Sequence, residues 1–307
     1  MSSANTLPPQ RVGITGARGV LGRSLQAHCT GIEWAPFPGD VRCPDEIKSW
    51  LRSSQPLDAI FHLAALVPTH LVDSDPPQAL RINVEGTCNV LQAIRTSSEA
   101  SSRPWVFLSS SSHVYASSNQ PLAEDSPAAP VTLYGLTKLQ AEHWALAFWN
   151  KFDLPVCVGR IFSYTSRWQA NSYFIPSLIN RITEAPLNAT LEIPGLLGSR
   201  DFLTTKLISQ AIQRLFECRA TGVVNIASGT PLRLLDIATE LQRRLARPDI
   251  KIVPLDAGTH HLNADVKKLA GLGIRLPLTL DELLDDVLAA CEDPPVPRVN
   301  TKRHAAG

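Results

Sequence analysis

Tyr134 and Lys138 are the residues of this chain whose types and spacing point most directly to chemistry. The run LYGLTKLQAEHWALAFW around them is typical of a helix, and a separation of four residues places both side chains on one face, one turn apart. Because a nearby ammonium favours the phenolate, we expect Lys138 to lower the pKa of Tyr134 toward neutrality. Such a phenol can exchange a proton with a substrate oxygen. The same spacing also occurs in ordinary surface pairs, so other residues must decide between the two interpretations.

The composition disfavours several classes of protein. The 307 residues carry a net charge of +1 and no long basic run, which argues against a nucleic-acid partner. No apolar run reaches the length of a membrane span, and the first residues lack the regions of a signal peptide. The six cysteines are widely spaced, which argues against a metal site or a disulfide framework and favours reduced thiols in a cytoplasmic protein.

Strand and helix patterns alternate through the first half of the chain. Apolar runs predict strands at 11–15, 31–37, 58–65, 104–112 and 154–162, with helices between them at 20–29, 44–54, 76–98 and 132–152. This order predicts an α/β fold, a doubly wound parallel Rossmann sheet over residues 10–162 with late elements from about 205–230. Residues 163–204 and 231–290 are expected to form a smaller C-terminal substrate lobe. We expect residues 1–9 and 294–307 to be disordered.

A glycine-rich loop follows the first predicted strand, with Gly13, Gly16, Gly19 and Gly22 at intervals of three. Glycine is needed where a backbone turns tightly and where it approaches a pyrophosphate closely. The helix that follows offers free N–H groups and its positive dipole end to the phosphates. Between a strand and a helix, this loop predicts a nicotinamide dinucleotide site.

The residues after the second strand bear on which nicotinamide nucleotide binds. An NAD site usually has an acid at the end of this strand, but here the strand ends in the run APFP at 35–38 and the next acid is Asp40. Arg18, inside the glycine loop, could pair with a 2′-phosphate. We therefore favour NADP(H) as the cofactor. NAD(H) is the alternative, in which Arg18 is a solvated loop residue and Asp40 contacts the adenine.

Short motifs extend these features along the chain: TGARGVLG at 15–22, DV at 40–41, HLAA at 62–65, NVEGT at 83–87, SSSSHVY at 109–115, YGLTK at 134–138 and RDF at 200–202. With them the chain resembles the extended short-chain dehydrogenases/reductases, the NAD(P)-dependent epimerase/dehydratase family. Within that family it looks most like the GDP-4-keto-6-deoxymannose reductases. The resemblance implies a Rossmann fold, a nicotinamide cofactor, a nucleotide-sugar substrate and a homodimer. Helices at about 76–97 and 131–150 would form a four-helix bundle between the protomers.

The resemblance also implies catalytic roles for three residues. Ser111 matches the family's serine by its distance from the VY pair, and Tyr134 and Lys138 match the remaining pair. Tyr134 would exchange a proton with the substrate oxygen, Ser111 would hydrogen-bond the same oxygen, and Lys138 would hold the nicotinamide ribose.

Binding roles follow from the same match. The cofactor is expected to contact Gly16, Arg18, Gly19, Val20, Gly22, Asp40, Val41, Leu63, Ala64, Ala65, Asn83, Tyr134 and Lys138. The substrate is expected to contact Ser112, His113 and Arg200. Arg200 matches an arginine that meets the substrate pyrophosphate, which suits bidentate recognition of an oxyanion. Asp201 is expected to orient Arg200 or to cap nearby backbone, and His62 to be structural.

Two features of the family's substrate site are absent. Ser163 stands where an asparagine is expected, and a segment with His260 and His261 replaces an Arg-Pro-x-Asp motif. Either these histidines and Arg167 supply the missing contacts, or the substrate is not a standard nucleotide sugar.

His113 bears on the type of reaction. A dehydratase needs an acid–base pair where this chain has Ser112-His113, so dehydration is disfavoured. An epimerase could use His113 as an acid or base, whereas in a reductase it would be a polar pocket wall. We expect NAD(P)H-dependent reduction of a 4-keto (6-deoxy) nucleotide sugar. The alternatives are a nucleotide-sugar 4-epimerase with tightly bound NAD, an extended reductase of a non-sugar carbonyl, and a cofactor-binding regulatory protein without chemistry.

Overall fold

Six parallel strands form the central sheet of the computed structural model, which describes residues 10–292 except 68, 98, 100–101 and 257–258. The strand order is β2-β1-β3-β4-β5-β9. The strands are β1 (Gln10–Thr15), β2 (Ile32–Pro36), β3 (Ala59–His62), β4 (Trp105–Ser111), β5 (Val156–Ile161) and β9 (Gly222–Ile226). The predicted parallel α/β sheet is therefore confirmed. The chain ends predicted to be disordered, 1–9 and 294–307, lie outside the described residues.

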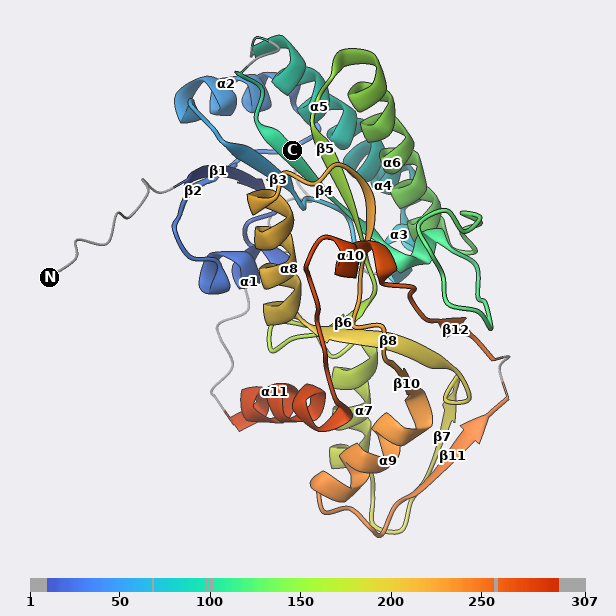
Figure 1. Cartoon of the computed structure of the whole chain (residues 1–307). Helices are drawn as coiled ribbons and strands as arrows, with labels where there is room; N and C mark the ends of the chain where they lie inside the picture. The colour runs from blue at the N-terminus through green and yellow to red at the C-terminus, as the bar shows by residue number, and fades with distance from the viewer. Residues whose placement is uncertain (1–9, 68, 98, 100–101, 257–258, 293–307) are drawn as a thin grey trace, which may run out of the picture.

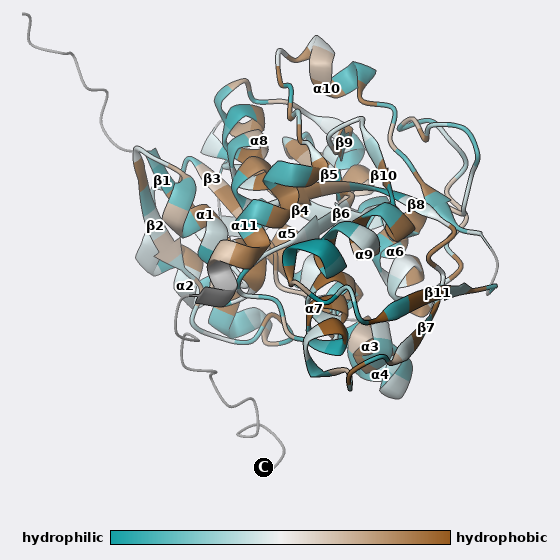
Figure 2. Ribbon diagram, turned by 90° about the horizontal axis from the view of Figure 1, so that it is seen from below, coloured by the Kyte–Doolittle hydropathy of each residue, from teal (hydrophilic) through white to brown (hydrophobic). Residues whose placement is uncertain are grey.

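Helices cover both faces of this sheet (Figure 1). On one face are α1 (Val20–His28) and α8 (Thr205–Glu217), and on the other are α2 (Pro44–Ser54), α5 (Gly86–Ser97) and α6 (Leu133–Phe152). Each face has its own apolar core, and β3, β4 and β5 are buried along their whole length. Continuous apolar strands are expected where a parallel sheet is covered on both sides. The amphipathic helices change from brown to teal around their circumference in Figure 2.

The helix predicted over 76–98 is wound differently from an ordinary α-helix. It consists of α4 (Pro76–Leu80), a π-helical turn (Arg81–Glu85) and α5. A short helix, α3 (Thr69–Ser74), precedes it and was not predicted. Hydrophobic periodicity does not reveal a single wider turn, which is why the prediction treated the segment as one regular helix.

The second half of the chain builds most of a smaller lobe beneath the sheet (Figure 1). Its helices are α7 (Phe174–Glu184), α9 (Leu234–Arg244) and α11 (Leu280–Glu292), which share an apolar core, and α10 (Lys267–Gly271) packs against the main sheet. The lobe strands are β6 (Ser163–Thr165), β7 (Thr190–Pro194), β8 (Ser199–Thr204), β10 (Pro231–Arg233), β11 (Lys251–Leu255) and β12 (His261–Leu262). Strand β8 pairs with β6, β10 and β12, and β7 pairs with β11. Strands β6, β10 and β12 have only two or three residues each, too few to carry a periodic signal in the sequence.

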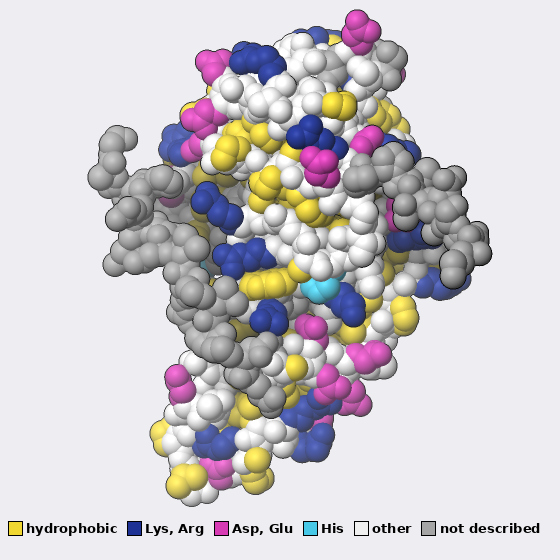
Figure 3. All heavy atoms as spheres, turned by 90° about the vertical axis from the view of Figure 1, so that its left-hand side faces the viewer, with side chains coloured by type: hydrophobic (Ala, Val, Ile, Leu, Met, Phe, Trp, Pro, Cys, Tyr) yellow, Lys and Arg dark blue, Asp and Glu magenta, His cyan; other side chains and the backbone are white. Residues whose placement is uncertain are grey.

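The described surface mixes both signs of charge. On the face shown in Figure 3, Lys and Arg side chains are interspersed with Asp and Glu side chains. Within the described ranges, none of the helices is both long enough and apolar enough to span a lipid bilayer.

Candidate active site

A cavity of about 1370 Å³ lies between the carboxyl ends of the central strands and the lobe. Its walls include the glycine loop after β1, the end of β4, the start of α6 and part of β8. In a doubly wound sheet, ligands bind at this edge, near the point where the strand order reverses. Every predicted catalytic, cofactor and substrate residue lines the cavity except Asn83.

The glycine loop is shaped so that other residues would not fit. Gly16 has φ +71°, and a Cβ there would lie 2.7 Å from the backbone nitrogen of Ala64. A Cβ on Gly22 would lie 2.3 Å from the carbonyl oxygen of Gly16. Helix α1 begins after Gly19 without a capping side chain, so its first N–H groups remain available to an anion. This cradle fits the pyrophosphate of a nicotinamide dinucleotide.

Charged residues lie at the adenosine end of the cavity. Arg18 is exposed and lines the cavity there. Arg42, which the sequence analysis did not consider, also lines the cavity and donates from Nε to both carboxylate oxygens of Asp40, at 2.9 and 3.1 Å. The nearest acid after β2 is thus neutralised by an arginine. This arrangement suits a cofactor with an additional phosphate, although it does not prevent NAD(H) from binding.

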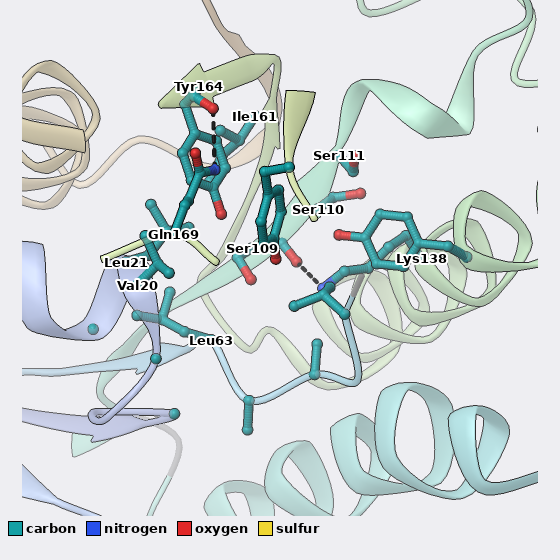
Figure 4. A pocket seen from close by; sticks show the side chains of 18 of the residues that line it. Val20, Leu21, Leu63, Ser109, Ser110, Ser111, Lys138, Ile161, Tyr164 and Gln169 are labelled. Carbon is teal, nitrogen blue, oxygen red and sulfur yellow. Dashed lines mark hydrogen bonds between the residues drawn. The ribbon is translucent and has the colours of Figure 1, made fainter. Parts of the chain in front are cut away.

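Local packing brings the three predicted catalytic residues together. Ser111 ends β4, and Tyr134 and Lys138 lie in the first two turns of α6, whose start is capped by the Thr132 hydroxyl accepting from Gly135 N at 3.0 Å. A Cβ on Gly135 would lie 2.1 Å from the carbonyl oxygen of His113, so glycine permits α6 to approach the turn after β4. Lys138 Nζ donates to the Ser109 carbonyl at 2.8 Å (Figure 4).

The electrostatics of this group differ from the prediction. Burial raises the pKa of Tyr134 above its usual value, and the hydrogen bond with Ser111 acts in the opposite direction. The prediction that Lys138 lowers the pKa of Tyr134 toward neutrality is therefore wrong: Nζ lies 5.9 Å from the ring centroid and is not among the causes of the shift. Burial also lowers the pKa of Lys138 to about 8. At neutral pH, Tyr134 carries its proton, which suits a proton donor.

His113 lies beside Tyr134. The two rings meet edge to face, with centroids 5.7 Å apart. Burial, and then the charge of Arg200, lower the pKa of His113 to about 4. The imidazole is therefore neutral at pH 7 and could accept a proton or a hydrogen bond, but it is not a cationic acid.

Arg200 projects from β8 into the lobe end of the cavity. Within the described part of the chain, its guanidinium has no ion pair or hydrogen bond, and burial lowers its pKa. Asp201, the adjacent acid, points away: its carboxylate accepts from Ser228 N and Oγ at 2.7 Å and from Gly229 N at 2.8 Å. Of the two roles predicted for Asp201, capping of backbone is the observed one. Arg200 remains free to bind an anion.

Asn83 is the predicted contact that lies elsewhere. Its Oδ1 accepts from Leu66 N at 2.6 Å, and its Nδ2 donates to the Thr137 hydroxyl at 3.0 Å. Asn83 does not line the cavity, and its side chain braces the loop after β3 against α6. His62 is structural as expected: its ring nitrogens contact the hydroxyls of Thr15 at 2.7 Å and Thr87 at 3.0 Å.

The lobe end of the cavity is more aromatic than predicted. His260, His261 and Arg167 do not line it, so they do not replace the missing arginine. Tyr164, Gln169 and Tyr173 do line it, and none of the three was predicted. Figure 4 shows Tyr164 and Gln169 on the wall opposite Lys138. The sequence signal that could have located them is position alone, since all three lie between Ser163 and the start of α7.

The comparisons with known proteins agree with this geometry. The model of the NAD dependent epimerase/dehydratase family matches residues 12–227. The chain is 31% identical over 257 residues to GDP-6-deoxy-D-mannose reductase of Pseudomonas aeruginosa, covering 80% of this chain and 83% of that protein. The solved structure of RMD from Pseudomonas aeruginosa, complexed with NADPH, superposes with a TM-score of 0.82 at 26% identity, over 92% of this chain and 98% of the other. MoeE5 in complex with UDP-glucose and NAD superposes with a TM-score of 0.78 at 25% identity, over 92% and 98%.

Proposed function

Because the chain belongs to the NAD dependent epimerase/dehydratase family, we propose that it reduces the keto group of a 4-keto (6-deoxy) nucleotide sugar with NADPH. One observation carries the proposal. A single cavity contains the glycine loop, the group Ser111, Tyr134 and Lys138, and an arginine without an acid partner among the described residues. The relative named GDP-6-deoxy-D-mannose reductase and the NADPH complex of RMD support the same reaction class.

Each of the three catalytic residues has a separate role in the reduction of the carbonyl. NADPH, when bound, supplies the hydride. Ser111 and Tyr134 hydrogen-bond the keto oxygen, and Tyr134 gives it a proton as negative charge develops there. The raised pKa of Tyr134 keeps this proton in place at neutral pH. Lys138, protonated below about pH 8, holds the nicotinamide ribose.

Arg200 would hold the substrate's diphosphate. It is the only Lys or Arg among the described lobe residues that line the cavity, and a guanidinium can bind two oxyanion oxygens at once. The first turn of α7 lies on the same wall through Phe174 and Ile175, so its free N–H groups could add to the contact. Tyr164 and Tyr173 would border the sugar.

A substrate panel tests the proposal. GDP-, dTDP- and UDP-linked 4-keto-6-deoxy sugars are each incubated with NADPH, loss of reduced nicotinamide is followed at 340 nm, and products are identified by NMR. We expect one nucleotide series to be reduced to a 4-hydroxy product. If the protein binds NADPH but consumes it with none of these sugars, the proposal is contradicted.

A second candidate is reduction of a non-sugar carbonyl. The number of cations favours this candidate. Arg200 is the only cationic side chain at the lobe end of the described cavity, and a diphosphate site usually has more. A simple ketone or aldehyde reduced faster than every sugar of the panel would support this candidate. Purified protein that carries bound NAD and consumes no NADPH would instead support the 4-epimerase alternative.

We also propose a homodimer through α5 and α6, in a cytoplasmic protein. Apolar side chains are exposed along this side, including Trp144 at 50% and Val131 at 75%, with Leu80, Leu133 and Leu136 nearby. Light scattering should give twice the mass of one chain, and Trp144→Glu should shift the mass toward a single chain. A monomer in the native protein would contradict this interface.

A further inference from the structure

A buried ion pair lies directly behind the catalytic residues. Glu142 follows Lys138 by one turn of α6 and is 0% exposed, and Arg160 on β5 is 6% exposed. The guanidinium donates from Nη2 to Glu142 Oε2 at 2.7 Å and from Nε to both carboxylate oxygens at 3.1 Å. Glu142 Oε1 also accepts from the hydroxyl of Ser110.

We propose that Glu142 is a positioning residue of this active site. It acts through two neighbours, by keeping Lys138 in its charged form and by fixing the end of β4 next to Ser111. The inference rests on the proposed role of Lys138 in holding the nicotinamide ribose.

The first contribution is geometric. Ser110 and Arg160 are register partners on the adjacent parallel strands β4 and β5. By binding both, the carboxylate of Glu142 ties α6 to two strands at the residue that precedes the catalytic serine. Arg160 continues this link, since its Nη1 donates to the hydroxyl of Tyr115 at 2.7 Å and to the Glu124 carbonyl at 3.0 Å.

The second contribution is electrostatic. Burial lowers the pKa of Lys138, and Glu142 is the acid that acts in the opposite direction. The other described groups that contact Lys138 or act on its charge do not supply negative charge. His62 on β3 is neutral, with a pKa lowered to about 3 by burial and by Lys138 itself, Tyr134 on α6 keeps its proton, and β4 offers the carbonyl of Ser109. Arg160, across the carboxylate, competes with Lys138 for the same anion.

This competition predicts opposite effects for the two members of the pair. Glu142→Gln removes the anion, so Lys138 loses its proton at lower pH. Arg160→Gln removes the competing cation, so Lys138 keeps its proton to higher pH. A pair that only stabilises the fold would give both variants the same kind of defect, because breaking either side of a buried ion pair is destabilising.

The experiment measures NADPH binding against pH and needs no substrate. Dissociation constants are determined by NADPH fluorescence from pH 7 to 10 for the native chain, Glu142→Gln, Glu142→Asp and Arg160→Gln. We expect the native affinity to fall with a midpoint near pH 8. Glu142→Gln should lower that midpoint by about one pH unit, the low end of the shift of about 1–3 units that a nearby opposite charge produces, because Glu142 raises the pKa of Lys138. Arg160→Gln should raise the midpoint, and Glu142→Asp should restore it toward the native value.

Controls separate the possible failures. Glu240→Gln breaks a Glu–Arg contact on α9, away from the cavity, and should leave the midpoint unchanged. If Glu142→Gln shows no cooperative thermal transition, the test rests on Arg160→Gln. A midpoint of NADPH affinity in Arg160→Gln that equals the native one or lies below it overturns the inference. Equal losses of affinity at every pH in both variants also overturn it. If the midpoints shift as predicted but the protein reduces no sugar of the panel, the proposed function is refuted and the role of Glu142 is supported.

Discussion

Replacing Arg200 by methionine should weaken substrate binding without weakening the fold. Within the described residues, the guanidinium forms no ion pair, so its removal strands no buried acid. Its pKa is lowered by burial, which means that the native state holds this charge in an unfavourable environment. Methionine retains much of the aliphatic stem. We therefore expect the free energy of unfolding of Arg200→Met to be no lower than the native value.

The loss of binding can be estimated from the bonds that Arg200 could form. A hydrogen bond to a charged group contributes about 1.5–3 kcal/mol, so the two bonds of a bidentate contact with a diphosphate contribute about 3–6 kcal/mol. At 1.4 kcal/mol per tenfold, the dissociation constant should rise by roughly 100-fold or more. Arg200→Lys should lie between, since a point charge replaces the planar fork.

Calorimetry with GDP, UDP and dTDP measures this effect without a turnover assay. The matched control is Arg243→Met, which removes an arginine that lies on the lobe surface and binds Glu240. We expect KM to rise with the dissociation constant while kcat changes little, because the diphosphate contact is the same in the ground and transition states. A native affinity for the nucleotide in Arg200→Met, or a collapse of its stability, would refute the reasoning.

The remaining predictions concern other parts of the cavity. Arg18→Ala should raise the Kd for NADPH by about tenfold and leave that for NADH unchanged, if a charge-assisted contact to the 2′-phosphate is lost; equal changes for both cofactors would remove Arg18 from that role. His113→Gln should reduce acid destabilisation. The pKa of native His113 is lowered to about 4, so the folded state binds this proton only at lower pH than the unfolded state does. As the pH falls below about 6.5, the native protein therefore loses up to about 1.4 kcal/mol of stability per pH unit. Chemical denaturation at pH 7 and pH 5 measures this, and equal losses in variant and native protein would contradict it. Gly22→Ala should prevent NADPH binding, because its Cβ would meet backbone at 2.3 Å; a native Kd would show that the loop can relax.

The sequence predicted the Rossmann sheet because its information is local. Each strand of the sheet is an apolar run between turn signals, and each helix carries a 3.6-residue pattern. The lobe differs, since β6, β10 and β12 have two or three residues and exist only because β8 offers them partners. Pairings of this kind depend on tertiary contacts and leave no periodic signal.

The candidate site was predicted only where its residues belong to short, local sequence motifs. Motif positions located Ser111, Tyr134, Lys138 and the glycine loop, all of which line the cavity. The pKa of Tyr134 could not be predicted from spacing, because burial raises it and the charge of Lys138 is not among the causes of the shift. Asn83 lies in the π-helical turn, and the sequence did not reveal that its side chain binds the loop after β3. The ion pair between Glu142 and Arg160 joins residues 18 positions apart and becomes visible only in the packed structure.

Conversion of Tyr134 to phenylalanine tests the central claim most directly. The change removes one hydroxyl from a buried ring and leaves the glycine loop and Lys138 in place. Loss of a general acid costs about 100-fold to 10,000-fold in rate. We predict that single-turnover reduction of the panel's best sugar slows by that factor, while the Kd for NADPH stays within about threefold of native because cofactor contacts are retained. A Tyr134→Phe protein that reduces the sugar at the native rate would contradict the account.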